Sequence, residues 1–383
     1  MTPPRPPARP DRRRFLAGAV GAALATALPA CATRGPQPQH DGRLPRLRLA
    51  RPDIDAARVI RQVAGLRPHR AAGFRVEAER IGDTLVIHDY GHGGCGVTLS
   101  WGTARLALAH ALAQPERTAA VIGCGAVGLA TARLLQDHGF AVTIYARELP
   151  PYTTSNIAGA QWGASDLVDP EYRTPAFAAE LARAARMAHL DFQLLPGASY
   201  GVSWKPLYMF SRGSEFDLGW DWATTPELFM ARRHAPGEHP FGDRTCFELQ
   251  TMLIEPNVYL AAMIDAFRGA GGRIERREFR DLAQLQALPE RLAMNCTGLG
   301  ARALFGDTTM QPVKGQLVVL APQPEIDYCE IGMGGYMFPR SDGILLGGSH
   351  ERGNWDVTPD PAVSARILAA HRRIFADRPG WLA

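Results

Sequence analysis

The sequence predicts an α/β protein of two domains, and three observations support this prediction. The chain has 383 residues, enough for one large domain or two ordinary ones. Hydrophobic residues make up 46% of it and charged residues 21%, which is a globular composition. Residues 118–146 read as strand, glycine-rich turn, helix and strand, the repeating unit of parallel α/β sheets.

The N-terminus reads as an export signal. Arg12, Arg13 and Arg14 form a twin-arginine pattern before an apolar run, residues 17–28, that is too short for the roughly 20 residues a membrane span needs. We therefore expect a signal peptide over residues 1–32, a linker over 33–56, and export by the twin-arginine machinery to the periplasm or cell envelope. Two cleavage sites fit: a lipoprotein box that would lipidate Cys31 and anchor the protein to the membrane, and a peptidase site ending at Ala32 that would release it.

The charge and the cysteines exclude several classes of protein. Five arginines and one aspartate among the first 30 residues account for the whole net charge of +4, so the remaining chain has no basic footprint for nucleic acid. The six cysteines show no metal-ligand or disulfide spacing. His88 and His92 are predicted on a strand and a glycine-rich loop without a third ligand, so we expect no metal site.

The unit from Thr118 to Ala146 predicts a dinucleotide site. Residues 119–122 form a short apolar strand, residues 127–138 have helical periodicity that stops at Gly139, and residues 141–145 alternate as a second strand. Between them Gly123, Gly125 and Gly128 have the G-x-G-x-x-G spacing, which permits a tight turn, close approach of a pyrophosphate and close helix–strand packing. The N-terminus of this helix would offer free N–H groups and positive potential to the phosphates.

Polar residues follow the second strand. Arg147 and Glu148 stand where a ribose-binding acid is usual, and either could meet the adenosine ribose or a phosphate. The run from Thr153 to Asn156 could be a plain helix N-cap or a second set of donors around the cofactor.

Two further glycine clusters are candidates for cofactor contact. Residues 88–98 form a glycine-rich loop between a strand at 85–88 and a helix at 100–112, which makes a second helix N-terminus suited to an anion. Residues 294–301, which begin Met-Asn-Cys-Thr-Gly, read as a turn at the end of a strand that would lie against the cofactor.

These segments together resemble the D-amino acid oxidase family of flavoproteins. The resemblance covers nearly everything from Ala57 to the C-terminus and is carried by residues 121–129, 145–150, 295–301, 65–68, 88–101, 313–316 and 347–355. It implies FAD as a non-covalent cofactor and an FAD-binding, Rossmann-like domain beside a substrate domain built on a mixed β-sheet. The boundaries we expect are 57–164 and 250–311 for the FAD domain, and 165–249 and 312–383 for the substrate domain.

The order of the segments differs from that of the family. In most relatives the dinucleotide fold opens the chain, whereas here Gly65–Pro68 and the loop at 88–98 precede it. We interpret the chain as a circular permutation whose original junction lies near residues 114–117. An inactive shuffled relic is the alternative, against which the intact glycine loops argue.

The resemblance also assigns roles to single residues. Arg67 matches the arginine that binds the substrate carboxylate, Tyr336 matches a tyrosine that meets the same carboxylate, and the carbonyl of Gly94 matches the acceptor for the substrate amine. Cofactor contacts are implied for Gly93, Gly94, Cys95, Gly96, Val97, Thr98, Gly123, Gly125, Ala126, Val127, Gly128, Arg147, Glu148, Thr153, Thr154, Ser155, Cys296, Thr297 and Gly298.

The implied reaction is oxidative deamination of a D-amino acid. The α-hydrogen would leave as hydride to flavin N5, O2 would reoxidise the flavin to give hydrogen peroxide, and the imino acid would hydrolyse to a 2-oxo acid and ammonia. Gly332 replaces a second tyrosine of many relatives, and Tyr328 is a candidate substitute at the wrong spacing. The alternatives are a related flavin amine oxidase or dehydrogenase acting on glycine or N-methylated amino acids, an exported flavin-binding lipoprotein without catalysis, and, less favoured, an NAD-dependent dehydrogenase.

The aromatic residues between Gly163 and Gln250 leave two interpretations open. Such residues could line a substrate pocket or lid, or they could form a hydrophobic core. The set comprises Trp204, Tyr208, Phe210, Phe216, Trp220 and Trp222. We expect the substrate pocket between the two domains, where Arg67, Tyr336 and Gly94 would converge.

Overall fold

The computed structural model describes residues 47–163, 166–195, 197–211, 219–332 and 334–382. The expected signal peptide, Cys31 and most of the linker lie outside the described residues. From Pro45 onward the chain forms one compact unit. None of the helices in the described ranges is long and apolar enough to cross a bilayer.

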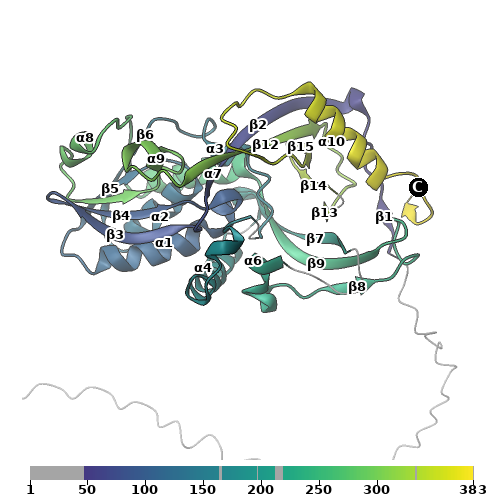
Figure 1. The fold of residues 1–383 in the computed structure, drawn as a ribbon, viewed down its shortest axis with the longest axis horizontal. Coiled ribbons are helices and arrows are strands. Elements are labelled where there is room, and N and C mark those ends of the chain that lie inside the picture. Colours follow the sequence, from purple (N-terminus) through teal and green to yellow (C-terminus); the bar gives the residue numbers. More distant parts are fainter. Residues whose placement is uncertain (1–46, 164–165, 196, 212–218, 333, 383) are drawn as a thin grey trace, which may run out of the picture. The chain divides into compact units, whose positions relative to one another are not determined.

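A six-stranded sheet forms one end of this unit (Figure 1). All neighbouring strands in it are parallel except the last pair. Within the described residues its order is β10 (Arg273–Arg276), β6 (Ala141–Ala146), β5 (Thr118–Ile122), β11 (Leu292–Asn295), β4 (Thr84–Tyr90) and β3 (Arg75–Ile81).

Helices cover both faces of this sheet. On one face, the sheet packs against α1 (Gly96–Leu112) and α2 (Ala126–Asp137), and alternate residues such as Val121, Ile144 and Met294 belong to the core on this side. Further from the sheet, α4 (Pro175–Gln193) packs on α1, and α7 (Pro256–Gly269) packs on α2. On the other face, the neighbouring residues Ala120 and Ala293 pack against α8 (Leu282–Gln286). Because both faces are buried, the central strands are continuous apolar runs.

A nine-stranded mixed sheet forms the other end (Figure 1). Its described order is β16 (Glu351–Arg352), β12 (Met310–Leu320), β15 (Gly343–Gly347), β14 (Gly335–Arg340), β13 (Cys329–Gly332), β7 (Val202–Ser211), β9 (Thr245–Ile254) and β8 (Arg232–His234), and β2 (Val59–Arg70) pairs with β12. The helix α10 (Pro361–Ile374) packs on one face of this sheet, over residues such as Val318 and Leu346.

The two ends of the described chain lie side by side. The short strand β1 (Leu49–Ala50) pairs in parallel with β17 (Trp381–Leu382), so Leu49 lies opposite Trp381. The remaining short elements are α3 (Thr154–Ile157), α5 (Gly197–Tyr200), α6 (Gly219–Ala223), α9 (Gly300–Leu304) and the 3-10 turns η2 (Ala56–Arg58), η3 (Gly93–Cys95), η4 (Pro170–Tyr172) and η5 (Pro226–Leu228).

The predicted strand–helix–strand unit is confirmed to within one residue by β5, α2 and β6. The helix ends as predicted at Gly139, whose φ of 83° lets Phe140 N donate to the carbonyl of Leu135 at 3.0 Å. The helix predicted from Ser100 begins one turn earlier, because η3 leads straight into helical backbone at Gly96.

The predicted domain boundaries remain predictions. The strands β3–β6, β10 and β11 lie inside the predicted FAD-domain segments, whereas β2, which also lies inside them, joins the nine-stranded sheet. The long pairing of β2 with β12, from Val59 to Arg70, places this strand in the second sheet.

Candidate active site

The glycine-rich turn lies between β5 and the first turn of α2. Gly123 has a φ of 117°, and a Cβ atom there would lie 2.4 Å from the carbonyl oxygen of Cys296. A Cβ atom on Gly128 would lie 2.1 Å from the carbonyl oxygen of Gly123. Glycine at both positions therefore lets the turn approach β11 closely, and the amino end of α2 faces the space above, where its N–H groups favour an anion.

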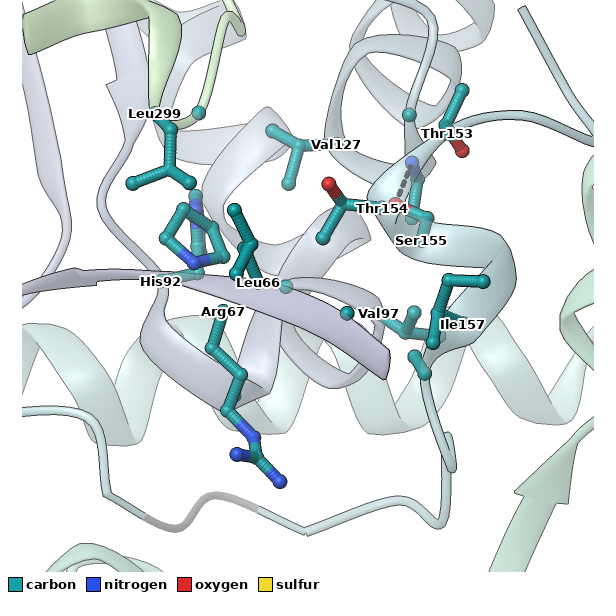
Figure 2. Close-up of a pocket in the computed structure, with 18 of the residues that line it drawn as sticks. Leu66, Arg67, His92, Val97, Val127, Thr153, Thr154, Ser155, Ile157 and Leu299 are labelled. Carbon is teal, nitrogen blue, oxygen red and sulfur yellow. Dashed lines mark hydrogen bonds between the residues drawn. The ribbon is translucent and has the colours of Figure 1, made fainter. Parts of the chain in front are cut away.

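The polar run after β6 forms the opposite wall of this space (Figure 2). Ser155 Oγ accepts a hydrogen bond from the N–H of Ala126 at 3.0 Å, so it touches the first residue of α2. Thr153 Oγ1 donates to Asn156 Oδ1 at 2.7 Å, within the first turn of α3. The cap interpretation is therefore confirmed for Thr153, and the interpretation of the run as donors around the cofactor stays a prediction.

A cavity of about 1200 Å³ extends from the glycine turn to the nine-stranded sheet. Most of the predicted site residues line it. They are Arg67, Gly93, Gly94, Gly96, Val97, Gly123, Gly125, Ala126, Val127, Gly128, Arg147, Glu148, Thr153, Thr154, Ser155, Cys296, Thr297, Gly298 and Tyr336. The structure thus brings together residues separated by more than 250 positions in the sequence.

Cys95 and Thr98 are predicted cofactor contacts that do not line the cavity. Cys95 is fully buried in the main hydrophobic core. Thr98 is also buried, and its hydroxyl donates to the carbonyl of Gly163 at 3.1 Å. The first turn of α1 directs these two side chains into the protein and leaves Gly96 and Val97 at the surface of the cavity.

Arg147 and Glu148 lie at the end of β6 and form ion pairs there. Arg147 Nη1 lies 3.3 Å from Glu278 Oε1, and Arg276 Nη2 lies 3.1 Å from Glu148 Oε2. Both predicted residues are partly exposed and line the cavity. Their contact with the ribose or a phosphate of a dinucleotide stays a prediction.

Buried polar contacts hold the glycine-rich loop after β4. The hydroxyl of Tyr90 donates to Asp307 Oδ2 at 2.8 Å, and Arg70 Nε donates to the same oxygen at 3.0 Å. Burial raises the pKa of Tyr90 to about 12. Burial alone would also raise the pKa of Asp307, but hydrogen bonds from Thr309, Tyr90 and Arg70 outweigh it and lower this pKa to about 2.

The two histidines of this loop are engaged by protein groups. His88 Nε2 lies 3.0 Å from Glu79 Oε2, and its Nδ1 lies 2.9 Å from Asn295 Nδ2. His92 Nε2 lies 2.9 Å from Thr103 Oγ1. The described residues contain no group of three side chains suited to hold a metal ion.

Arg67 and Tyr336 lie on one face of the nine-stranded sheet. In the antiparallel register Arg67 on β2 is opposite Val313 on β12. Four residues further along β12, Leu317 is opposite Gly347 on β15. Gly347 is in turn opposite Tyr336 on β14. Directly opposed residues share a face, and so do residues two apart on a strand, so the two side chains project to the same side. Figure 2 shows Arg67 pointing away from Leu66, to the other side of β2 from Val127.

Two glycines make room for these side chains. A Cβ atom on Gly315 would lie 2.6 Å from Arg67 Nη1, and one on Gly347 would lie 2.0 Å from Tyr336 Cζ. Among the described residues no carboxylate lies within ion-pair distance of Arg67, whose Nη1 donates to the carbonyl of Ser349 at 3.4 Å. A cation held in a cavity wall without a counter-ion is suited to bind the carboxylate of a small molecule.

Gly332 does not line the cavity, and Tyr328 does not substitute for the missing tyrosine. A Cβ atom on Gly332 would lie 2.9 Å from the ring of Phe210, which fills the neighbouring space. The hydroxyl of Tyr328 donates to the carbonyl of Ala50 at 2.9 Å, in the core beneath α10. The role suggested for Tyr328 as a substitute is therefore wrong, because its hydroxyl is engaged in this core and Tyr328 does not line the cavity that Tyr336 lines.

The described aromatic residues of the uncertain central region do not line the cavity. Tyr208 and Trp222 are buried, whereas Trp204 is 48% exposed on the outside of β7. Phe216 lies outside the described residues. For the described members the core interpretation therefore fits better than the pocket interpretation.

Sequence reasoning missed the segment from Ile157 to Gln161, which lines the cavity directly after the polar run. A Cβ atom on Gly159 would lie 2.9 Å from the ring of Phe338, so this segment lies against the sheet face that carries Tyr336. Its small apolar residues have no motif of their own, and only their position after Thr153–Asn156 could have indicated them. Leu66, His350 and Trp355 were missed as well.

Comparisons with known proteins agree with this geometry. The profile of the family described as "DAO: FAD dependent oxidoreductase" matches residues 118–382. A D-amino-acid oxidase of Rubrobacter xylanophilus is 33% identical over 266 residues, which cover 68% of this chain and 77% of that protein. A D-amino-acid oxidase of Streptomyces coelicolor is 34% identical over 267 residues, which cover 68% and 77% of the two chains.

Solved structures show the same fold at lower sequence identity. The glycine oxidase of Geobacillus kaustophilus superposes with a TM-score of 0.52 and 19% identity, over 67% of this chain and 77% of that chain. The glycine oxidase of Bacillus cereus gives a TM-score of 0.51 and 15% identity, over 68% and 78%. The predicted α/β fold with its mixed sheet is thereby confirmed.

Proposed function

The chain belongs to the FAD dependent oxidoreductase (DAO) family, and we propose that within it this enzyme is a D-amino acid oxidase. The observation that supports this assignment best is the placement of Arg67 and Tyr336 on one face of the nine-stranded sheet, over Gly315 and Gly347 respectively. The substrate would be a free D-amino acid, and the products a 2-oxo acid, ammonia and hydrogen peroxide.

The cavity fits the cofactor FAD. The turn at Gly123–Gly128 and the N–H groups of α2 would hold its pyrophosphate, and Arg147 or Glu148 its adenosine ribose. The loop at Gly93–Val97 opens the longer helix α1, whose N-terminus would stabilise negative charge on the reduced ring. FAD supplies the acceptor for the hydride that leaves the substrate.

The side chains of this chain would bind and orient the substrate. Arg67 would hold its carboxylate with two parallel N–H bonds, and the hydroxyl of Tyr336 would donate to the same group. The carbonyl of Gly94 would accept a hydrogen bond from the amine. Three fixed points around the α-carbon orient its hydrogen, and orientation of this kind is a large part of the rate enhancement in such reactions.

The chain order supports the proposed circular permutation. The strand β2 and the loop after β4 precede β5 in sequence but close on the same cavity. The family profile begins at residue 118, where the expected original N-terminus lies. The pairing of β1 with β17 lays Trp381 and Leu382, at the end of the region that the family profile matches, beside Leu49 and Ala50, which lead into β2.

Export is a further part of the proposal and rests on Arg12–Arg14 and the apolar run that follows. The test is cell fractionation with intact mass measurement of the mature protein. A mass that includes a lipid on Cys31 indicates a membrane-anchored enzyme, and a mass that begins after Ala32 indicates a soluble periplasmic one. An uncleaved protein in the cytoplasm contradicts export.

The activity test supplies purified protein in air with pairs of D- and L-amino acids, glycine and sarcosine, and measures peroxide and 2-oxo acid. We expect both products in equal amounts from D-amino acids only. Turnover of glycine or sarcosine in preference to every D-amino acid would favour the alternative amine oxidase, for which Gly332 in place of a tyrosine is the specific observation. No product from any substrate, with FAD bound, contradicts the assignment.

A further inference from the structure

Asp166 is the carboxylate on the substrate side of the cavity. Four described acidic residues line the cavity. Glu148 and Glu278 lie just after β6 and β10 respectively, in ion pairs with arginines. Asp89 is fully buried behind the glycine loop, where Thr131 Oγ1 donates to it at 3.2 Å. Asp166 differs from Asp89 because its side chain is 39% exposed. It differs from Glu148 and Glu278 because it follows the segment that lies against the sheet face of Tyr336.

A short chain of contacts joins Asp166 to the substrate-binding arginine. Arg67 Nη1 contacts the carbonyl oxygen of Ser349, and the next residue, His350, contacts Asp166 Oδ2 through its Nε2. Consecutive Cα atoms are about 3.8 Å apart. The path from the guanidinium of Arg67 to the carboxylate of Asp166 therefore runs through one residue step and one imidazole ring. This path is comparable in length to an extended lysine or arginine side chain, so a basic substrate bound at Arg67 could reach Asp166.

The backbone holds Asp166 in place for such a role. Its φ is 57°, a left-handed conformation that costs a non-glycine residue energy and is often found in ligand sites. Its carbonyl oxygen packs so closely on the glycine loop that a Cβ atom on Gly93 would lie 2.8 Å away. The segment continues to Asp169, whose carboxylate forms two hydrogen bonds with Arg352, at 2.6 and 2.9 Å.

Negative charge is in excess around this position. Asp166 and Asp169 share one arginine, since Arg352 Nη2 also lies 3.7 Å from Asp166 Oδ1. His350 contacts Asp166, and His69 contacts Asp169. The side chain of His350 is 44% exposed, and contacts at exposed positions contribute little to stability. A fully charged side chain of a ligand could therefore replace His350 beside Asp166.

We infer that Asp166 binds the cationic side chain of the substrate, so that the enzyme prefers basic D-amino acids such as D-lysine, D-ornithine and D-arginine. The substrate carboxylate at Arg67 and its side-chain ammonium or guanidinium at Asp166 would then be held at two oppositely charged points. This inference rests on the proposed function and names its substrate class.

The test compares D-lysine with D-norleucine, which has the same carbon chain without the ammonium group. Wild-type enzyme is expected to show a kcat/KM for D-lysine at least tenfold higher, mainly through a lower KM. The Asp166→Asn variant is expected to lose about tenfold in this ratio while its activity on D-norleucine changes little. Glu171→Gln, which removes an exposed carboxylate from the same segment outside the cavity, is the matched control and keeps the wild-type ratio.

A second variant keeps the inference testable if Asp166→Asn loses activity on both substrates. His350→Asn removes the competing partner of Asp166, and the ratio is expected to rise or stay high. A ratio near one in wild type, an unchanged ratio in Asp166→Asn, or a fall in His350→Asn would overturn the inference while the oxidase assignment stands. Failure of both D-amino acids to reduce the flavin of wild type would instead overturn the proposed function itself.

Discussion

The guanidinium of Arg67 faces a cavity without a carboxylate partner among the described residues, although most arginines of the surrounding strands are paired. On the same strand Arg61 pairs with Asp342 at 2.9 Å, and Arg70 pairs with Asp307 at 3.0 Å. An unpaired cation in a partly buried position costs free energy unless a ligand supplies the counter-charge. At the scale of single residues, this is the feature that most directly indicates a carboxylate substrate.

Replacing Arg67 tests this role. Arg67→Lys keeps the charge but loses the two parallel hydrogen bonds, and we expect kcat/KM for D-amino acids to fall about a hundredfold with FAD content unchanged. Steady-state peroxide formation measures the effect. Arg61→Lys, on the same strand but in an exposed ion pair, is the control and should behave like wild type. Equal activity of both variants would remove Arg67 from the site.

Replacing Gly347 by alanine tests how closely the ring of Tyr336 packs on β15. A Cβ atom in Gly347→Ala would lie 2.0 Å from the ring, so the ring has to move. We expect a loss of about 1–3 kcal/mol in the free energy of unfolding and a higher KM. Gly269→Ala, at the end of α7 with no atom near the added methyl, should not destabilise the protein. Denaturant unfolding of both variants measures the difference, and equal stability would contradict the packing described.

Asp307 makes the free energy of unfolding depend on pH in the acid range. Its folded pKa is lowered from 3.8 to about 2, so its contribution is present above pH 4 and is lost as the pH falls through 2. Asp307→Asn should be less stable at pH 7 by about 2 kcal/mol and should lose the part of the acid dependence between pH 4 and 2. Asp243→Asn, an exposed carboxylate, is the control. Parallel stability curves for wild type and Asp307→Asn would exclude this role.

At the scale of elements, the local signals were sufficient for β5, α2 and β6. Their apolar runs, the three glycines and the Gly139 stop are all encoded within 30 consecutive residues, and tertiary contacts do not override them. The early start of α1 was not predictable, because glycines at 93, 94 and 96 argue locally against a helix. The cavity-lining segment Ile157–Gln161 was missed because its sequence of small apolar residues is equally typical of an ordinary loop or of a core segment.

Replacing Gly128 by alanine tests how closely α2 packs on the glycine-rich turn and whether this packing is needed to bind FAD. Gly128→Ala places a methyl group 2.1 Å from the backbone oxygen of Gly123, which cannot move without shifting β5. We expect the Kd for FAD to rise about tenfold or more. Fluorescence titration of the apoprotein with FAD measures this, with Gly269→Ala as the control. An unchanged Kd would mean that the turn does not hold the cofactor.

At the scale of the whole molecule, the cavity is assembled from sequence regions that lie far apart in the chain, and we propose that their order is permuted relative to the family. Resemblance to the family identified the segments. Their convergence depends on the pairing of β2 with β12 over 11 residue pairs and on the placement of both sheets, and local sequence patterns encode neither. The side-chain end of the substrate site was equally hidden, because Asp166 becomes informative only beside His350 and Ser349.

Restoring the usual family order tests the permutation. A chain that begins at Thr118, joins Leu382 through a short linker to Leu49 and ends after Leu112 is expected to fold, bind FAD and keep wild-type kcat within a few-fold, because the joined ends already lie side by side. Circular dichroism, flavin content and peroxide formation report each property. A rearranged chain that folds but binds no flavin would contradict the equivalence of the two orders.

The most direct test of D-amino acid oxidation is anaerobic mixing of the purified flavoprotein with single D- and L-enantiomers, while the flavin absorbance is recorded. We predict rapid bleaching by D-enantiomers only, recovery of the absorbance when air is admitted, and at least a hundredfold slower bleaching in Arg67→Lys at low substrate concentration. Bleaching by L-enantiomers at the same rate, or a stable oxidised spectrum with every D-amino acid tried, would contradict the assignment.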